Sequence, residues 1–236
     1  SRACPYNRRM SAAPPPRDEI RFCSSADGTR IAFAQSGGGY PLVKAAHWMT
    51  HIEHDWASPI WRPWLERLSR TYRFVRYDIR GCGLSDRDVA DLSVEAWVRD
   101  LEAVVDAAGL DRFALLGASQ GGVIALEYAA RHPDRVSELV LVGAYSRGPA
   151  MRAKTDAERA EFATLLKIVD VGWGKADPSF RQIFTSHFLP DGTLDHFRSF
   201  NELQRLSTSA QTAGRLMRAW ADANADAAAP RVRCAT

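Results

Sequence analysis

The chain has 236 residues, of which 46% are hydrophobic and 25% are charged, with 16 Gly and 12 Pro. These proportions are typical of globular domains and exclude collagen, low-complexity disorder and coiled coil. The formal net charge is +3, but residues 1–17 contain four Arg and no acid, so the rest of the chain is close to neutral. Because the rest of the chain carries no excess of basic residues, we do not expect it to form a surface that binds nucleic acid.

Arg and Pro dominate the N-terminus, which predicts a disordered leader over residues 1–18. This region has no apolar run of signal-peptide length, and no stretch approaches the roughly 18 apolar residues of a membrane span. The cysteines are widely spaced and lack a metal-binding pattern, which predicts free thiols. They are Cys4, Cys23, Cys82 and Cys234. We therefore expect a cytoplasmic protein without a membrane segment, a metal or a cofactor.

Short apolar runs separated by turn residues begin after the leader. They predict strands at 20–23, 31–34 and 42–46, the first two as a hairpin. Helical spacing of apolar residues follows from Pro59, and 72–77 is a fourth strand. Ser93 is placed to cap a helix that ends at Gly109.

The middle of the chain alternates strand and helix patterns. We predict a strand at 113–116, a helix at 121–131 and a strand at 136–142. Strand, helix and strand in this order pair in parallel, in a sheet covered on both faces. The fold class is therefore α/β.

Strand patterns stop at Tyr145, and four helical patterns follow. They lie at 162–169, at 180–188, at 197–206 and through Leu216 and Trp220. We expect a core over 19–144 and an inserted helical subdomain over 145–228. Residues 229–236 have the pattern of the start of a further strand.

The sharpest chemical signal is the sequence G-x-S-x-G at 117–121, between a predicted strand and a predicted helix. Small residues on both sides of Ser119 allow a cramped turn that pushes its hydroxyl outward, and the helix behind it offers free N–H groups. This pattern is typical of a nucleophilic serine. We therefore take Ser119 as the candidate catalytic residue.

From residue 20 onward the chain resembles the α/β-hydrolase family. Besides the turn at Ser119, the stretch 78–86 is similar to the family's D-x-R-G-x-G-x-S-D turn after the fourth strand. The resemblance implies a predominantly parallel sheet flanked by helices, with the helices after Tyr145 in the place of the family's lid. It also implies that Asp78, Arg80 and Asp86 brace a loop.

The resemblance further implies an oxyanion hole formed by two backbone N–H groups. The residue after the nucleophile, Gln120, supplies one of them. The second comes from the loop after the third strand, where His47 stands at the family's Gly position and Trp48 becomes the donor. A shift of one residue in this alignment would make Met49 the donor instead.

The family places a catalytic acid after its seventh strand and a His after its eighth. This chain matches the family only to the start of the seventh strand, so no residue corresponds to either, and the last two strands are expected to be missing. His51 or His54 is a candidate substitute base. The spacing of His51, His54 and Asp55 on one helical face is a weaker candidate for a metal site.

These features predict a serine hydrolase that cleaves a carboxylic ester through an acyl-enzyme, with a small hydrophobic ester as its partner. Aromatic residues of the lid either pack in its core or line the ester pocket. They are Phe180, Phe184, Phe188, Phe197 and Phe200. Perhydrolase or haloperoxidase chemistry on the same Ser119, and a ligand-binding or regulatory module without turnover, are the alternatives.

Overall fold

The computed structural model describes residues 18–175 and 177–236, so all but the last residue of the expected leader lies outside the described residues. The strands are β1 (Glu19–Ser24), β2 (Arg30–Ser36), β3 (Tyr40–Ala45), β4 (Tyr72–Tyr77), β5 (Phe113–Ala118) and β6 (Val136–Val142). The first four helices are α1 (Ile52–Asp55), α2 (Arg62–Ser69), α3 (Val94–Ala107) and α4 (Gly121–Arg131). The later helices are α5 (Pro149–Arg152), α6 (Asp156–Gly172), α7 (Pro178–Phe188), α8 (Leu194–Ser207) and α9 (Ala210–Ala221).

The six strands form one sheet in the order β1-β2-β4-β3-β5-β6. The hairpin β1–β2 and the pair β2–β4 are antiparallel, whereas β4, β3, β5 and β6 pair in parallel. In the parallel part Leu42 faces Phe74 on one side and Ala114 on the other. The expected α/β class with a predominantly parallel sheet is confirmed.

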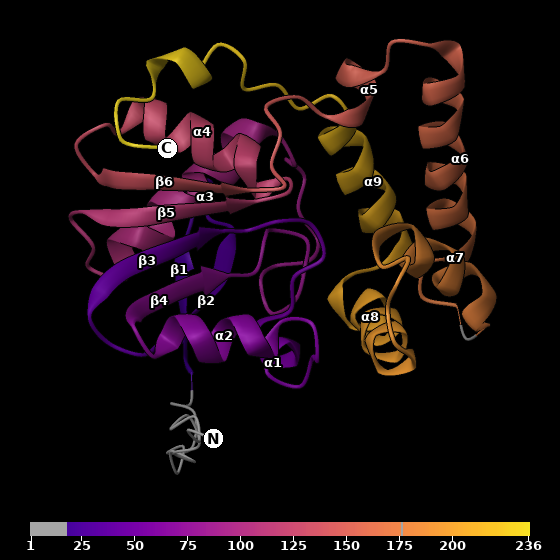
Figure 1. Cartoon of the computed structure of the whole chain (residues 1–236), viewed down its shortest axis with the longest axis horizontal. Helices are drawn as coiled ribbons and strands as arrows, with labels where there is room; N and C mark the ends of the chain where they lie inside the picture. Colours follow the sequence, from indigo (N-terminus) through magenta and orange to yellow (C-terminus); the bar gives the residue numbers. More distant parts are fainter. Residues whose placement is uncertain (1–17, 176) are drawn as a thin grey trace, which may run out of the picture.

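Helices cover both faces of the sheet (Figure 1). One face carries the larger core, to which α3 contributes Trp97 and Leu101 and α4 contributes Ile124. The opposite face carries a smaller core in which Leu65 of α2 packs with Phe74 of β4. Burial on both faces explains why the central strands read as continuous apolar runs.

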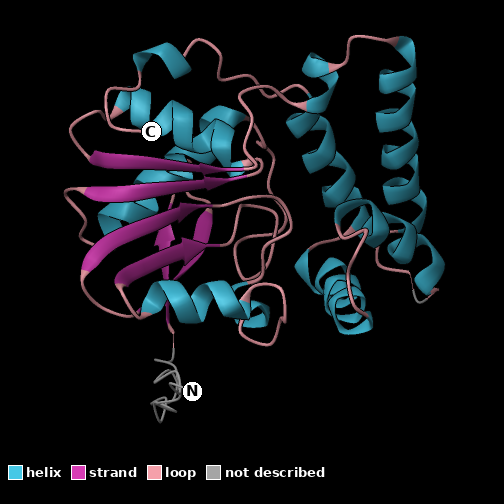
Figure 2. Cartoon of the chain, in the orientation of Figure 1, coloured by secondary structure: helices cyan, strands magenta, loops and turns pink. Residues whose placement is uncertain are grey.

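Helices α5 to α9 form a separate layer beyond the carboxyl ends of the parallel strands (Figures 1 and 2). Two neighbouring chain segments connect this layer to the sheet. The Gly148 N–H donates to the Ala223 carbonyl at 2.7 Å, and the Ala225 N–H donates to the Ser146 carbonyl at 2.7 Å. The helical layer is therefore connected to the sheet by two antiparallel chain segments that are hydrogen-bonded to each other. None of the described helices is long and apolar enough to cross a bilayer.

Several predicted element bounds agree closely with the structure. Strands 72–77 and 136–142 and helix 121–131 are confirmed, and Ser93 caps α3 by accepting a hydrogen bond from the Ala96 N–H. The helix expected from Pro59 begins only at Arg62. The short helices α1 and α5 were not predicted, because a single turn shows no apolar periodicity.

Residues 229–236 contain a 3₁₀ turn at Ala229–Arg231 and one parallel bridge between Ala235 and Glu138 of β6. The Leu139 N–H donates to the Ala235 carbonyl at 2.8 Å. Ala235 therefore lies beside β6 and pairs with it in parallel, as a residue of a neighbouring strand would.

Candidate active site

Ser119 sits on a sharp turn between β5 and α4. Its φ angle is +50°, in the left-handed region that non-glycine residues rarely adopt. The turn is held by the Ser119 N–H, which donates to the Val142 carbonyl at 3.0 Å, and by the Gly122 N–H, which donates to the Ser119 carbonyl at 3.0 Å. A conformation that costs about 1–2 kcal/mol persists only where its surroundings fix it, as here.

The glycines on both sides of Ser119 are required by close packing. A Cβ atom at Gly117 would lie 2.9 Å from the Ala125 side chain, and one at Gly121 would lie 2.8 Å from the Ala45 carbonyl oxygen. Both distances are too short for a carbon atom. The G-x-S-x-G spacing therefore lets α4 pack against β5 and β3 while the serine stays at the turn.

The two predicted oxyanion donors lie on adjacent loops. No described residue accepts a hydrogen bond from the Gln120 N–H, which therefore stays available at the start of α4. The Trp48 N–H is engaged, because it donates to Oε1 of the Gln120 side chain at 2.8 Å. The structure thus brings Trp48 and Gln120 together. The oxygen of the Gln120 side-chain amide occupies the place at the Trp48 N–H that an oxyanion would take. Met49 has a φ of +67°, so the loop turns sharply just after Trp48.

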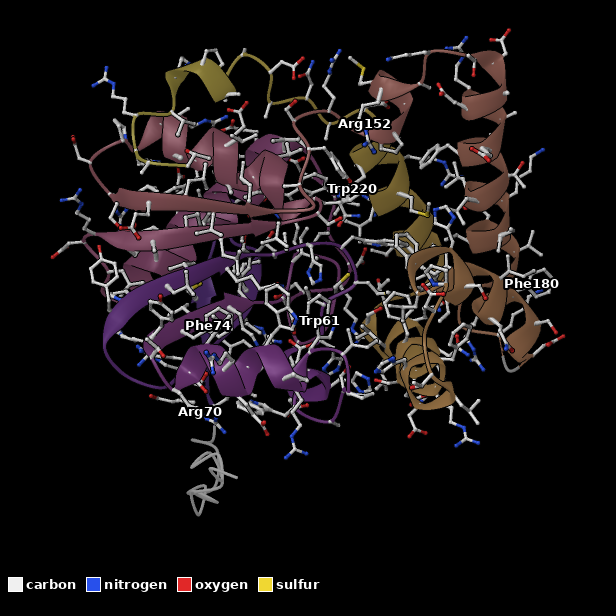
Figure 3. The ribbon with its side chains drawn as sticks, in the orientation of Figure 1. Trp61, Arg70, Phe74, Arg152, Phe180 and Trp220 are labelled. Atoms are coloured by element: carbon white, nitrogen blue, oxygen red, sulfur yellow. The ribbon has the colours of Figure 1, made fainter. Side chains whose placement is uncertain are left out.

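Ser119 lies on the wall of three cavities among the described residues. The first, the apolar cavity, has a volume of about 220 Å³. Its walls include Trp48, Ile60, Phe184, Phe188 and Leu203. In Figure 3, Trp61, which also borders it, lies between the sheet and the helical layer, whereas Phe180 lies at the far side of that layer.

The second, the polar cavity, has a volume of about 210 Å³ and lies against the side of the sheet that carries α2. Most of its wall is apolar and includes Trp61, Trp64 and Phe74. It is named here for its polar side chains, which are Lys44, His47, Asp55 and Arg76. The third, the Tyr145 cavity, has a volume of about 180 Å³ and shares wall residues with a larger groove of about 960 Å³ along α6. Arg152 borders both of these spaces and lies near Trp220 in Figure 3.

Aromatic contacts connect the loop that carries Trp48 to the helical layer. The Trp48 indole stacks on Trp173 with ring centres 5.3 Å apart and meets the edge of Phe184 at 5.4 Å. Phe188 and Phe200 extend this cluster. Of the five aromatic residues expected in the core or the pocket of the helical layer, three border the apolar cavity.

The two histidines expected as substitute bases lie away from these cavities. His54 is held by the Ser199 carbonyl at 3.2 Å, and Nδ1 of His51 is buried without a partner among the described residues. Neither borders a cavity that Ser119 borders, so the interpretation of His51 or His54 as the base is not supported. No group of three metal-ligating side chains is found among residues 18–175 and 177–236.

The turn at 78–86 braces the loops, as the resemblance implied. Both carboxylate oxygens of Asp78 accept backbone hydrogen bonds, from Ile52 at 3.0 Å and from Leu84 at 2.8 Å. Complete burial raises the pKa of Asp78 to about 7. The Arg80 guanidinium is fully buried against Asp100, with its closest contact at 2.6 Å.

Two residues near Ser119 were missed from the sequence. The Tyr145 phenol lies close enough to the Ser119 side chain to interact with it, and burial raises the pKa of this phenol. The His47 ring borders two of the cavities that Ser119 borders. Both residues follow the ends of parallel strands, and side chains at such positions meet at one edge of a sheet.

Comparison with known proteins places this geometry in a family. A profile described as "alpha/beta hydrolase fold" matches residues 50–226. The 2-hydroxymuconate semialdehyde hydrolase of Pseudomonas sp. (strain CF600) is 32% identical over 163 residues, which are 67% of this chain and 56% of that protein. The 2-hydroxy-6-oxo-2,4-heptadienoate hydrolase of Pseudomonas putida is 38% identical over 127 residues, which are 53% of this chain and 45% of that protein.

The chain spans about half the length of these two curated relatives. Among solved structures, an esterase from Exiguobacterium antarcticum superposes with a TM-score of 0.73 at 24% identity, over 90% of this chain and 77% of that one. The match of the family profile to three quarters of the residues, together with the strained serine turn, leads to one conclusion. This chain belongs to the alpha/beta hydrolase fold family.

Proposed function

We propose that this protein is a serine hydrolase that cleaves a carboxylic ester through an acyl-enzyme on Ser119. The observation that carries the proposal is the strained turn, which presents Ser119 to three cavities at the N-terminus of α4. Strain of this kind is retained where it orients a reacting group. The named hydrolases among the relatives support the same reaction class.

In the proposed reaction the Ser119 Oγ attacks the ester carbonyl as its proton passes to a base, and the carbonyl oxygen becomes an oxyanion. The N–H groups of Gln120 and Trp48 hold this oxyanion. Collapse expels the alcohol, which takes up the proton, and leaves an acyl-enzyme that water hydrolyses. Because the Trp48 N–H is bonded to the Gln120 amide, that amide must move away before the second donor can act.

The substrate is proposed to be a small hydrophobic ester. The apolar walls of the cavity formed by Ile60, Phe184 and Leu203 suit a hydrocarbon group. We assign the role of a lid to residues 145–228 and that of the hydrolase core to 19–144, since the cavity walls come from both. A cytoplasmic location remains part of this proposal.

Labelling with a fluorophosphonate probe tests the nucleophile. The chain should be labelled at Ser119, as read from the mass of the tryptic peptide, and Ser119→Ala should not be labelled. Ser199→Ala is the matched control, because it removes a serine hydroxyl that bonds to His54 and Ser58 instead, and it should be labelled like the parent. Labelling that survives Ser119→Ala would contradict the proposal.

A second candidate function is a ligand-binding or regulatory module that keeps the pocket without turnover. The bond between the Trp48 N–H and the Gln120 amide favours it, because that bond occupies one oxyanion donor. Saturable binding of an ester without release of alcohol would identify this function. Perhydrolase or haloperoxidase chemistry would instead show as peracid formation when hydrogen peroxide replaces water.

A further inference from the structure

The polar cavity beside Ser119 contains more hydrogen-bond donors than acceptors. Lys44 on β3 and Arg76 on β4 are register partners, so two cations lie next to each other on neighbouring strands. Like charges in such positions destabilise a sheet. Asp18 and Asp55 both bond to Arg76, and Lys44 has no carboxylate partner among the described residues.

Lys44 has two neighbours within the cavity. Its Nζ lies 3.2 Å from Nδ1 of His47 and 5.1 Å from the centre of the Trp61 ring. An ammonium carries three N–H bonds, so at least one remains for a ligand. The side chain is only partly buried and borders the polar cavity, together with Ser119.

His47 adds a second free donor. A protonated Lys44 can only donate, so Nδ1 of His47 accepts and the proton of the neutral ring is on Nε2. No described residue forms a hydrogen bond with Nε2, so this N–H is available to a ligand. The ring borders the polar cavity and the apolar cavity, so this N–H lies near Ser119.

Two further donors belong to residues that border this cavity. Nη1 of Arg76 and Nε1 of Trp61 are both buried without a hydrogen-bond partner in the described part of the chain. Both residues border the polar cavity, and Arg76 is almost completely buried. Both atoms are shielded from the cavity, so the donors that a ligand can reach there are those of Lys44 and His47.

We propose that the polar cavity is a carboxylate subsite, in which Lys44 and His47 bind an anionic group of the substrate beside its scissile carbonyl. This inference rests on the proposed function and narrows it, because the substrate becomes an ester that also carries a carboxylate. The uncharged part of the substrate then fills the apolar cavity. A carboxylate suits the site because it offers several acceptor positions and no donor.

The charges around Lys44 agree with this assignment. Burial and the nearby Arg76 lower the pKa of Lys44 to about 8, whereas Asp55 and Asp78 act to raise it. Lys44 therefore keeps its charge at pH 7. Burial and the Lys44 charge lower the pKa of His47 well below its usual value, so this ring stays neutral. Binding of a carboxylate should weaken as the pH rises through about 8, when Lys44 loses its proton.

Calorimetric titration of the Ser119→Ala protein tests the subsite without requiring turnover. The probes are monomethyl glutarate, a monoanion at pH 7, and dimethyl glutarate, its neutral counterpart. The monoanion should bind about 10- to 100-fold more tightly, as expected for charge-assisted hydrogen bonds. In this background Lys44→Met should remove most of that preference, and His47→Leu should reduce it.

Two control variants locate the effect. Lys167→Met removes one exposed lysine charge from α6, and Arg152→Met removes the cation that borders the Tyr145 cavity. Both should keep the preference for the monoanion. Melting temperatures show whether each variant is folded, and His47→Leu provides an independent test should Lys44→Met fail to fold.

The proposal is overturned if the parent binds the two probes equally or binds neither. It is also overturned if the preference survives both Lys44→Met and His47→Leu, or is lost in Arg152→Met instead. Failure of fluorophosphonate labelling would remove the hydrolase function but leave this binding result standing. The two proposals can therefore fail separately.

Discussion

The contact between the Trp48 N–H and the Gln120 side chain predicts an unusual effect of substitution at position 120. The side-chain oxygen lies 2.8 Å from the donor that the oxyanion needs, so this bond must break during acylation. A neutral hydrogen bond contributes about 0.5–1.5 kcal/mol, which corresponds to about 2- to 12-fold in rate. Gln120→Met keeps the length of the side chain but cannot hold the N–H, so it should accelerate acylation by this factor.

A carboxylate at the same position should have the opposite effect. Gln120→Glu would hold the Trp48 N–H by a charged hydrogen bond, which is stronger by about 1 kcal/mol or more, and should slow acylation about fivefold to tenfold. The assay is the second-order rate constant for fluorophosphonate labelling of Ser119, with melting temperatures to confirm that each variant is folded. The backbone N–H of residue 120 is present in all three proteins.

The expected order of rates is Met, then Gln, then Glu at position 120. A Gln120→Met protein that reacts more than about tenfold more slowly than the parent would refute the reasoning, because losing an oxyanion donor costs at least that much. In that event the Gln120 side-chain amide would hold the Trp48 loop in place for the reaction and would not obstruct the Trp48 N–H. Equal rates in all three proteins would show that this bond is already open during reaction.

Three buried or strained groups give stability predictions that urea unfolding can check. Asp100→Asn removes the buried one of the two carboxylates that pair with the fully buried Arg80 guanidinium and leaves only Asp27, so the free energy of unfolding should fall by up to about 3–5 kcal/mol, and a loss below 1 kcal/mol would contradict this. The pKa of Asp78 is raised from 3.8 to about 7, so the native state holds this proton more tightly than the unfolded chain does. Stability should therefore decline as the pH rises across this range, and an equal slope in Asp78→Asn would count against it. Ser119→Gly should be more stable than Ser119→Ala by about 1 kcal/mol, because only glycine relieves the φ of +50°, and equal stability would argue against strain.

Much of the fold follows from local patterns in the sequence. The helix α3 was predicted because its apolar spacing, the capping Ser93 and the final Gly109 agree with one another. The Ser119 turn was predicted for a similar reason, since the motif, the preceding strand and the following helix all coincide. Consistent signals of this kind depend on near neighbours in the chain.

The polar surroundings of Ser119 could not be predicted in this way. Lys44 and Arg76 become neighbours only because β3 and β4 pair in the sheet, and residues 46–71 separate the two strands. The bond from the Trp48 N–H to Gln120 joins residues 72 positions apart. Contacts of this range are set by strand order and loop packing, which no local periodicity encodes.

The stacking of Trp48 on Trp173 gives the protein a built-in optical reporter. Two indoles 5.3 Å apart with planes 30° apart couple their electronic transitions, so the pair contributes a circular dichroism signal of its own. One ring belongs to the loop that would hold the oxyanion and the other to the end of α6. Any separation of the helical layer from the sheet therefore changes the spectrum, and ligand entry can be followed without an attached dye.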